Sequence, residues 1–263
     1  MQKWINGEGL IGVTRIAVPN ATSPAQSGRR REMSNVLSYG GGVNSTAIIA
    51  LAKMGKLPMP DHVVFSDTGA EYPYTYAYLD YLESQGIHIT YLTGGSYRTK
   101  EQNWETLIEY CQRKGIIPSI FHRWCSMDWK VRPIDLFREG NEYWVGIDAG
   151  EAHRAEKRHG KGIWFPLIEL KMDREACKKV IRDMGWGVPL KSGCYVCPYQ
   201  SRKDWINLRE RYPDLYQVAR HLEAKSRVTF VHGYTLDEYT EGADKQMTLG
   251  VVPLDQKCEC FFD

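Results

Sequence analysis

A run of three glycines followed by small polar residues is the part of this chain that most directly predicts chemistry. The glycines at 40–42 follow a short apolar stretch, and Asn44, Ser45 and Thr46 lead into the apolar run 47–52. Glycines let the backbone turn with positive φ and approach a ligand closely. The N–H groups of such a turn and of the following helix start point at one spot, where the helix dipole favours an anion. The pattern predicts a phosphate-binding loop, or else a tight turn without a ligand, made of Gly40, Gly41, Gly42, Asn44, Ser45 and Thr46.

Two cysteines at metal-ligand spacing form a second candidate site. Cys194 and Cys197 make a C-x-x-C motif followed by Pro198, and this spacing lets two thiolates reach one metal centre. A C-x-x-C motif near an α/β pattern is also typical of a redox dithiol. Among the seven cysteines of the chain, Cys111 and Cys177 fall inside helical patterns and are expected to be buried thiols.

The elements that must position these residues alternate as in a parallel α/β protein. Repeated strand-helix order predicts a doubly wound parallel sheet, Rossmann-like, with ligands outside the carboxyl ends of the strands. The glycine loop, residues 67–71 and residues 146–151 all fall at such ends. Asp173 is the expected N-cap of a late helix. Strands are expected at 36–38, 62–65, 87–92 and 143–147, and helices at 45–54, 74–84, 103–114, 131–138 and 173–184.

Length and composition favour one intracellular domain. The 263 residues are 43% hydrophobic, which suits a single α/β domain with a cysteine-bearing C-terminal helical region. Residues 1–33, with a basic run at 29–31, are expected to form a flexible extension before a domain at 34–263. No stretch approaches the roughly 18 apolar residues of a membrane span, and the start lacks a secretory signal. We therefore expect a soluble, cytoplasmic protein whose cysteines are thiols, redox groups or metal ligands.

Five segments, in order, resemble one known family. Residues 40–45 are similar to the pyrophosphatase loop Ser-Gly-Gly-x-Asp-Ser, with Gly40 in place of its first serine and Asn44 in place of its aspartate. No Gly-Lys-Ser/Thr follows, so this is not a Walker loop. The resemblance is to the phosphoadenylyl-sulfate (PAPS) reductase-like proteins of the adenine-nucleotide α-hydrolase superfamily. The other matching segments are 65–73, 123–126 with Lys130 and Pro133, 146–154, and 193–198.

The resemblance implies a bound adenine nucleotide, either ATP or the sulfonucleotides PAPS and APS. A pyrophosphatase loop directs attack to the α-phosphorus and releases pyrophosphate, chemistry that depends on positioning and charge neutralisation. Because Asn44 lacks the charge of the family aspartate, Asp67 and Glu71 are the nearest alternative carboxylates for Mg²⁺. Their other reading is a strand-end turn in which Glu71 helps to start a helix. The family pattern gives catalytic positions at Asp67, Glu71, Arg154 and Cys260, and further nucleotide-binding positions at Arg123, Lys130 and Gly146.

The resemblance also implies a metal centre. In the iron–sulfur APS reductases, a Cys-Cys pair and a distant C-x-x-C hold the cluster, and the alignment places Cys125 on the first cysteine of the pair and Ser126 on the second. Three thiolates fit a [4Fe–4S] cluster with one open iron or with a fourth ligand from the C-terminal tail. Zinc is the alternative metal, since thiolates suit it equally, and a site without metal is the third reading. The expected ligands are Cys125, Cys194, Cys197 and Cys258, with Cys260 as the alternative to Cys258.

Three functions remain open on these residues. The first is ATP-dependent adenylylation coupled to sulfur transfer, with DNA or tRNA as the acceptor and a sulfur donor protein as a partner. The second is reductive cleavage of a sulfonucleotide to sulfite, with Cys260 as nucleophile and thioredoxin as reductant. The third is a nucleotide sensor without turnover, which Asn44 keeps open; a homo-oligomer is compatible with each. Aromatic residues that lie among basic ones either stack on bases or belong to the core: Trp124, Trp129, Tyr195, Tyr199 and Trp205.

Overall fold

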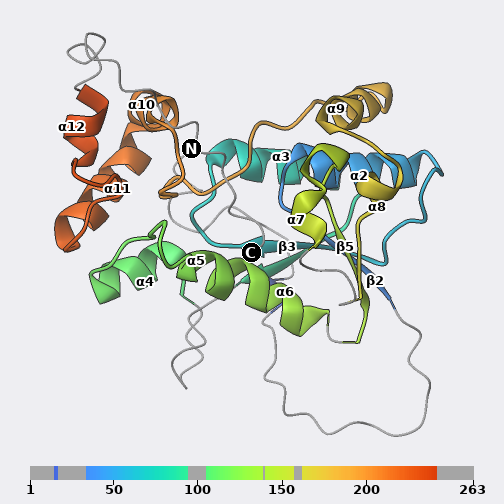
Figure 1. The fold of residues 1–263 in the computed structure, drawn as a ribbon, viewed down its shortest axis with the longest axis horizontal. Coiled ribbons are helices and arrows are strands. Elements are labelled where there is room, and N and C mark those ends of the chain that lie inside the picture. The colour runs from blue at the N-terminus through green and yellow to red at the C-terminus, as the bar shows by residue number, and fades with distance from the viewer. Residues whose placement is uncertain (1–14, 17–33, 94–104, 139, 157–161, 242–263) are drawn as a thin grey trace, which may run out of the picture.

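A sheet that has six strands among the described residues forms the centre of the protein. The computed structural model describes residues 15–16, 34–93, 105–138, 140–156 and 162–241 (Figure 1). Every neighbouring pair of strands is parallel, which confirms the α/β class and the parallel sheet expected from the sequence. The described residues include no helix long and apolar enough to cross a membrane. The strands are β1 Arg15–Ile16, β2 Asn35–Ser38, β3 His62–Asp67, β4 Ile89–Thr93, β5 Glu142–Val145 and β6 Ile163–Trp164, in the order β1-β4-β3-β2-β5-β6.

Both faces of the sheet are buried. Successive side chains of each strand point to opposite faces, so each strand contributes residues to the cores on both sides. Leu37, Phe65 and Tyr91 belong to one apolar core, and Val36 and Val64 belong to another. Strands buried on both faces are apolar along their whole length rather than alternating. That explains why the sequence predicted these strands well but gave no sign of which face each residue takes.

Helices cover the two faces, as in a doubly wound fold (Figure 1). The first core joins the sheet to α2 (Val43–Lys53), α3 (Pro73–Ser84), α8 (Pro166–Glu169) and α9 (Arg174–Asp183). The second core includes Ile134 of α6 (Arg132–Phe137) on the opposite face. The short α7 (His153–Glu156) follows β5.

Local signals set the helix ends. Asp173 caps α9, its carboxylate accepting from Ala176 N at 2.8 Å, as expected. The helix expected from residue 103 begins at Leu107 in α4 (Leu107–Lys114), because Thr106 and Glu109 form a capping box. Gly115 ends it in the left-handed conformation with φ 63°.

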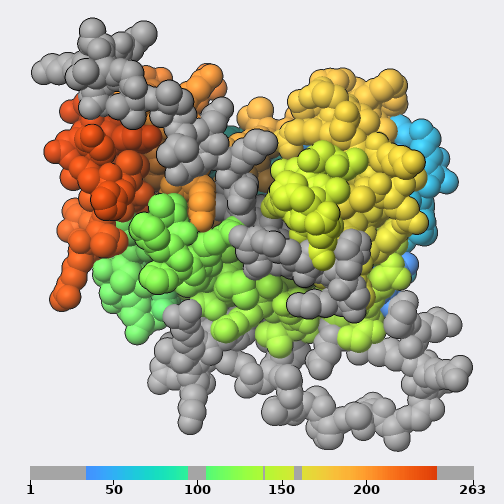
Figure 2. All heavy atoms as spheres, in the orientation of Figure 1, coloured from blue at the N-terminus to red at the C-terminus, as the bar shows by residue number. Residues whose placement is uncertain are grey.

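The C-terminal helices form a third core with the segment that bears Cys125. They are α10 (Arg202–Arg211), α11 (Pro213–Lys225) and α12 (Leu236–Glu241), and Figure 2 shows their orange and red atoms at one side of the molecule. They pack with α4, with α5 (Trp124–Ser126) and with a π-helix at Met127–Val131. Trp129, Tyr195 and Trp205 are buried in this core. Those three aromatics are therefore packing residues, and the base-stacking interpretation is wrong for them.

The N-terminal extension contributes one structural element. The two residues of β1 pair with Tyr91 and Leu92 at the edge of the sheet, so the expectation of a wholly flexible extension is not met at these two residues. Residues 1–14 and 17–33 lie outside the described part of the chain.

The strand order brings two loops together at one place. The chain runs from β2 outward through β3 to β4 and then returns to the other side of β2, where Ser38 pairs with Val145 of β5. Ligands of open α/β sheets bind at such a switch point. Gly146 follows β5 directly, and a Cβ on it would lie 2.8 Å from Ser45 N and 3.1 Å from Asn44 C. Only glycine allows this approach.

We predict that Gly146→Ala destabilises the fold. The new methyl group would meet backbone atoms of Asn44 and Ser45 that cannot turn away, and overpacking of this kind costs about 1–3 kcal/mol. The free energy of unfolding, measured by urea denaturation, should fall by that amount. Gly187→Ala is the control, since a Cβ there meets nothing within 4 Å. Equal stability of the two variants would contradict the close approach.

Candidate functional site

The glycine loop connects β2 to α2 and is built to expose backbone N–H groups. Gly41 has φ 71°, and Gly42 is the N-cap of α2 without a side-chain cap. The helix therefore begins with N–H groups that no side chain satisfies, which is the arrangement that binds anions. Thr46 donates its hydroxyl to Gly42 O at 2.8 Å and lies 3.1 Å from the Tyr39 hydroxyl. Thr46 thus holds the loop from inside, whereas Ser45 reaches Gly42 O at 3.3 Å.

Two buried polar atoms beside the loop have no partner among the described residues. They are Asn44 Oδ1 and Thr75 Oγ1. Thr75 adjoins the loop, because a Cβ on Gly41 would lie 2.9 Å from its Cγ2. A buried oxygen without a hydrogen bond costs about 1–3 kcal/mol, and native proteins rarely leave one unless a ligand or water completes it. Both oxygens are therefore available to a ligand or a water molecule at this loop.

Asp148, which no sequence motif predicted, lies beside the glycine loop. It follows β5 and is 3% exposed, and Asn44 Nδ2 donates to its Oδ2 at 3.0 Å. It belongs to the segment 146–154, in which only Gly146 and Arg154 are predicted as functional from the sequence. Two features of the sequence could have indicated it. Asn44 has an amide at the loop position where the family has an aspartate, and Asp148 supplies a carboxylate just after the strand that neighbours β2.

Asp67 and Glu71 lie at the end of β3 but already have partners. Asp67 Oδ1 accepts from Gly69 N at 2.8 Å and from the Tyr76 hydroxyl at 2.7 Å. Burial and the Asp67 charge raise the pKa of Tyr76 well above its usual value, so its hydroxyl stays a donor. Glu71 pairs with Lys130 Nζ at 2.9 Å. Neither carboxylate therefore stands free for a cation in this conformation.

Glu71 also connects the sheet to the cysteines. The Cys194 thiol donates to Glu71 Oε1 at 3.3 Å, and the Thr68 hydroxyl donates to the same oxygen at 3.2 Å. The backbones of Glu71 and Cys194 form an antiparallel bridge, in which Tyr195 N donates to Ala70 O at 2.9 Å. The C-x-x-C segment is thus attached directly to the end of β3.

The three cysteines expected to share a metal line one cavity. Cys125 comes from α5, and Cys194 and Cys197 come from the C-x-x-C turn, where Cys197 N donates to Cys194 O at 3.1 Å. Arg123 and Lys130 line the same cavity. Within the described ranges, no three His, Cys, Asp or Glu side chains are arranged as metal ligands, so the structure brings these residues to one place without a formed ligand set.

Burial favours the neutral thiol form of Cys194 and Cys125 in this state. Burial raises the pKa of Cys194 well above its usual value, and the charge of Glu71 raises it further, whereas Lys130 opposes the shift. Burial also raises the pKa of Cys125, against the lowering effect of Lys130 and Arg123. Metal ligation requires thiolates. The donor set fits a thiolate-bound metal, because the two cations lie where deprotonated sulfurs need them.

The other predicted residues lie in the cavity lining, in α7 after β5, or outside the described residues. Arg123 has the left-handed backbone, φ 42°, and its guanidinium lies 5.6 Å from the centre of the Tyr199 ring. Such a conformation is uncommon without glycine and is concentrated at functional sites. Arg154, in α7, pairs with Glu151 at 2.9 Å. Cys258 and Cys260 lie outside the described residues.

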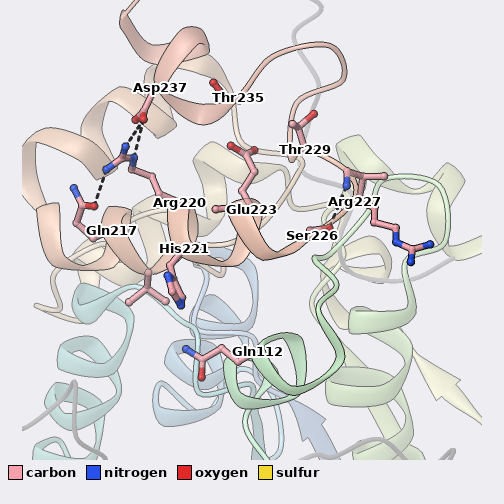
Figure 3. Close-up of a pocket in the computed structure, with 13 residues that line it drawn as sticks. Gln112, Gln217, Arg220, His221, Glu223, Ser226, Arg227, Thr229, Thr235 and Asp237 are labelled. Carbon is pink, nitrogen blue, oxygen red and sulfur yellow. Dashed lines mark hydrogen bonds and ion pairs between the residues drawn. The ribbon is translucent and has the colours of Figure 1, made fainter.

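A second hollow lies away from these residues, among the C-terminal helices (Figure 3). It is bounded by α4, α11 and α12. Arg220 pairs with Asp237 across it, and Glu223 accepts from Leu236 N at 2.7 Å, which holds the connection to α12. None of its lining residues belongs to the glycine loop or to the cysteine cavity, so it is separate from the site described above.

We predict that Gly41→Ala abolishes nucleotide binding by the loop. The added Cβ would lie 2.9 Å from Thr75 Cγ2 and also requires φ 71°. Gly55→Ala is the matched control, because Gly55 has φ 72° and meets nothing within 4 Å. Both variants should lose about 1–2 kcal/mol of stability from the left-handed backbone. Only Gly41→Ala should lose affinity for ATP, measured by calorimetry; equal affinities in the two variants would refute the loop assignment.

Comparison with known proteins gives distant relatives and no family. No family model matches the chain. The chain is similar to the uncharacterized protein MJ0066 of Methanocaldococcus jannaschii, at 26% identity over 211 residues, which cover 69% of this chain and 40% of that protein. It is also similar to the uncharacterized protein MJ0973 of the same organism, at 22% identity over 226 residues, covering 78% of this chain and 50% of that protein. The matched regions thus span half or less of these relatives.

Proposed function

We propose that the protein is a pyrophosphatase-loop enzyme that uses ATP to adenylylate an acceptor and then transfers sulfur to it through the cysteine cavity. The glycine loop at the switch point of the sheet supports the nucleotide part of this proposal. The three cysteines around one cavity support the sulfur part. The resemblance to PAPS reductase-like proteins gives the same two parts in the same order along the chain.

One observation carries the proposal, namely that the two parts share a wall. Ser192 lines the cavity together with the three cysteines. Cβ atoms on the loop glycines would lie 3.5 Å from Ser192 Cβ at Gly41 and 3.3 Å from Ser192 Oγ at Gly42. A phosphate on the loop and a sulfur in the cavity are thereby kept in adjacent spaces. Such proximity is what a two-step transfer requires.

The residues of the chain have separate tasks in this reaction. The N–H groups at the start of α2 hold the phosphates of ATP, and the helix dipole stabilises their charge. A nucleophilic oxygen of the acceptor attacks the α-phosphorus, the bond to the bridging oxygen breaks, and pyrophosphate leaves. A sulfur nucleophile then displaces AMP from the acceptor. Lys130 remains paired with Glu71 beside the thiols and keeps that side of the cavity polar.

The cysteine cavity is the place for a resident metal. Cys125, Cys194 and Cys197 would hold a [4Fe–4S] cluster, or zinc as the alternative. A cluster would supply an iron centre that carries sulfur to the activated acceptor. The acceptor class follows from the resemblance alone and is a nucleic acid, DNA or tRNA, with a separate protein as the sulfur donor.

The test of this function is the product formed from each nucleotide. Anaerobically purified protein is incubated with ATP and Mg²⁺, with and without tRNA or DNA, and pyrophosphate is measured. We expect pyrophosphate release that depends on an acceptor and is lost in Gly41→Ala. Sulfite release from PAPS or APS instead would assign the protein to the reductase function. Nucleotide binding without pyrophosphate or sulfite under either condition would leave a sensor.

We predict that replacing any cysteine of the cavity removes the metal. Serine at Cys125, Cys194 or Cys197 should remove most iron and sulfide per chain, because a cluster needs all its thiolates. The controls are Cys111→Ala and Cys177→Ala, which do not line the cavity; burial raises the pKa of both thiols to about 12. Zinc is measured in the same samples to identify the metal. Full metal occupancy in Cys125→Ser would overturn the shared centre.

A further inference from the structure

We infer that Asn44 and Asp148 form a binding site for a hard divalent cation, Mg²⁺, that accompanies the nucleotide on the glycine loop. The inference rests on the proposed ATP binding and adds a residue to it. From the sequence alone, Asp67 and Glu71 are the expected carboxylates for this role, because the loop has an amide where the family has a carboxylate. The structure assigns the role to the end of another strand.

The Asp148 carboxylate lacks a cationic partner. It is 3% exposed, and its Oδ2 accepts from Asn44 Nδ2. Its other oxygen, Oδ1, has no hydrogen bond to any residue that the structure describes, and none of the described ion pairs includes Asp148. Burying a carboxylate without a paired charge is costly. A bound cation would remove this cost.

The Asn44 amide presents the second ligand. Asn44 is 9% exposed, and its Oδ1 is buried without a partner within the described chain. Carboxylate and amide oxygens are the ligands that hard cations prefer. The 3.0 Å between the Asn44 amide and the Asp148 carboxylate is close to the roughly 2.9 Å that separates adjacent ligands at the 2.0–2.1 Å bond lengths of octahedral Mg²⁺. The oxygen and nitrogen of an amide exchange places by rotation about χ2.

The position of the pair suits a metal that is shared with phosphates. Asn44 is the second residue of α2 and adjoins the N–H groups that would hold them. Asp148 reaches it because Gly146 allows β5 to end against this helix. Proteins bind Mg²⁺ with one or two carboxylates and leave the remaining positions to water and substrate phosphates. One buried carboxylate and one amide at a phosphate loop match that pattern.

The competing carboxylates are occupied. Asp67 Oδ1 accepts two hydrogen bonds, and Glu71 is paired with Lys130. A purely structural reading of Asn44 and Asp148 is that their hydrogen bond fixes the loop after β5 to α2. The two readings differ in one measurable property, which is how the affinity for nucleotide depends on Mg²⁺.

Calorimetry with α,β-methylene-ATP, in MgCl₂ and again in EDTA, tests the inference. The native protein should bind the analogue more tightly with Mg²⁺. Asp148→Asn should lose about 10- to 100-fold of affinity in Mg²⁺, yet bind as well or better in EDTA, because a charge that repels the triphosphate is gone. Asp173→Asn is the matched control, since asparagine caps α9 equally well, and it should behave as the native protein. A parallel loss in both buffers would make the pair structural and overturn the inference.

Asn44→Asp tests the same site by adding a second carboxylate ligand. It also covers the case in which Asp148→Asn fails to fold. Two carboxylates about 3 Å apart repel each other without metal. The melting temperature of this variant should fall in EDTA and recover on addition of Mn²⁺, with loss of the free Mn²⁺ signal in electron paramagnetic resonance. A melting temperature that Mn²⁺ does not change would overturn the inference. If the native protein binds no nucleotide in either buffer but Asn44→Asp still takes up Mn²⁺, the proposed function fails and the cation site remains.

Discussion

The close contact between the end of β5 and the start of α2 is the constraint on which the site depends. A Cβ on Gly146 would be 2.8 Å from Ser45 N, so the two backbones meet as closely as they can. This contact exists because β2 lies between β3 and β5: the strands β3 and β4 are added on one side of β2, and β5 and β6 are added on the other. It places the glycine loop beside Asp148 and sets the width of the space in which phosphates would lie.

A second contact joins the residues that follow β3 to the segment that contains Cys194 and Cys197. Residues 193–195 pair with residues 70–72, through Tyr72 N to Gly193 O at 3.2 Å and Tyr195 N to Ala70 O at 2.9 Å. Through these backbone hydrogen bonds the start of the C-x-x-C segment pairs with the residues that follow β3, although the two segments are far apart in sequence. The preceding residue, Ser192, then stands between the glycines and the cavity. The glycine loop and the cysteine cavity therefore both adjoin Ser192.

The sequence was sufficient where local rules decide the structure. Asp173 caps its helix, Gly115 ends another, and the apolar runs at β2 and β3 are strands, because capping and burial act over a few residues. It was insufficient where distant segments meet. The partnership of Asn44 with Asp148 depends on which strand neighbours β2, and the burial of Trp129, Tyr195 and Trp205 depends on how the C-terminal helices pack. The periodicity of apolar residues in the sequence indicates neither the order of the strands nor the packing of distant helices.

The buried charges at the cysteine cavity are paired, whereas the buried charge at the glycine loop is not paired within the described residues. At the cysteines, Lys130 already neutralises Glu71, and the thiols stay protonated, so this side is balanced without a ligand. At the loop, the buried Asp148 has only an amide beside it, and Asn44 Oδ1 and Thr75 Oγ1 lack partners among the described residues. Unpaired groups are tolerated where a ligand completes them. Two of these unpartnered oxygens and the buried Asp148 carboxylate thus lie together at the glycine loop, whereas the Glu71 charge beside the cysteines is already paired with Lys130.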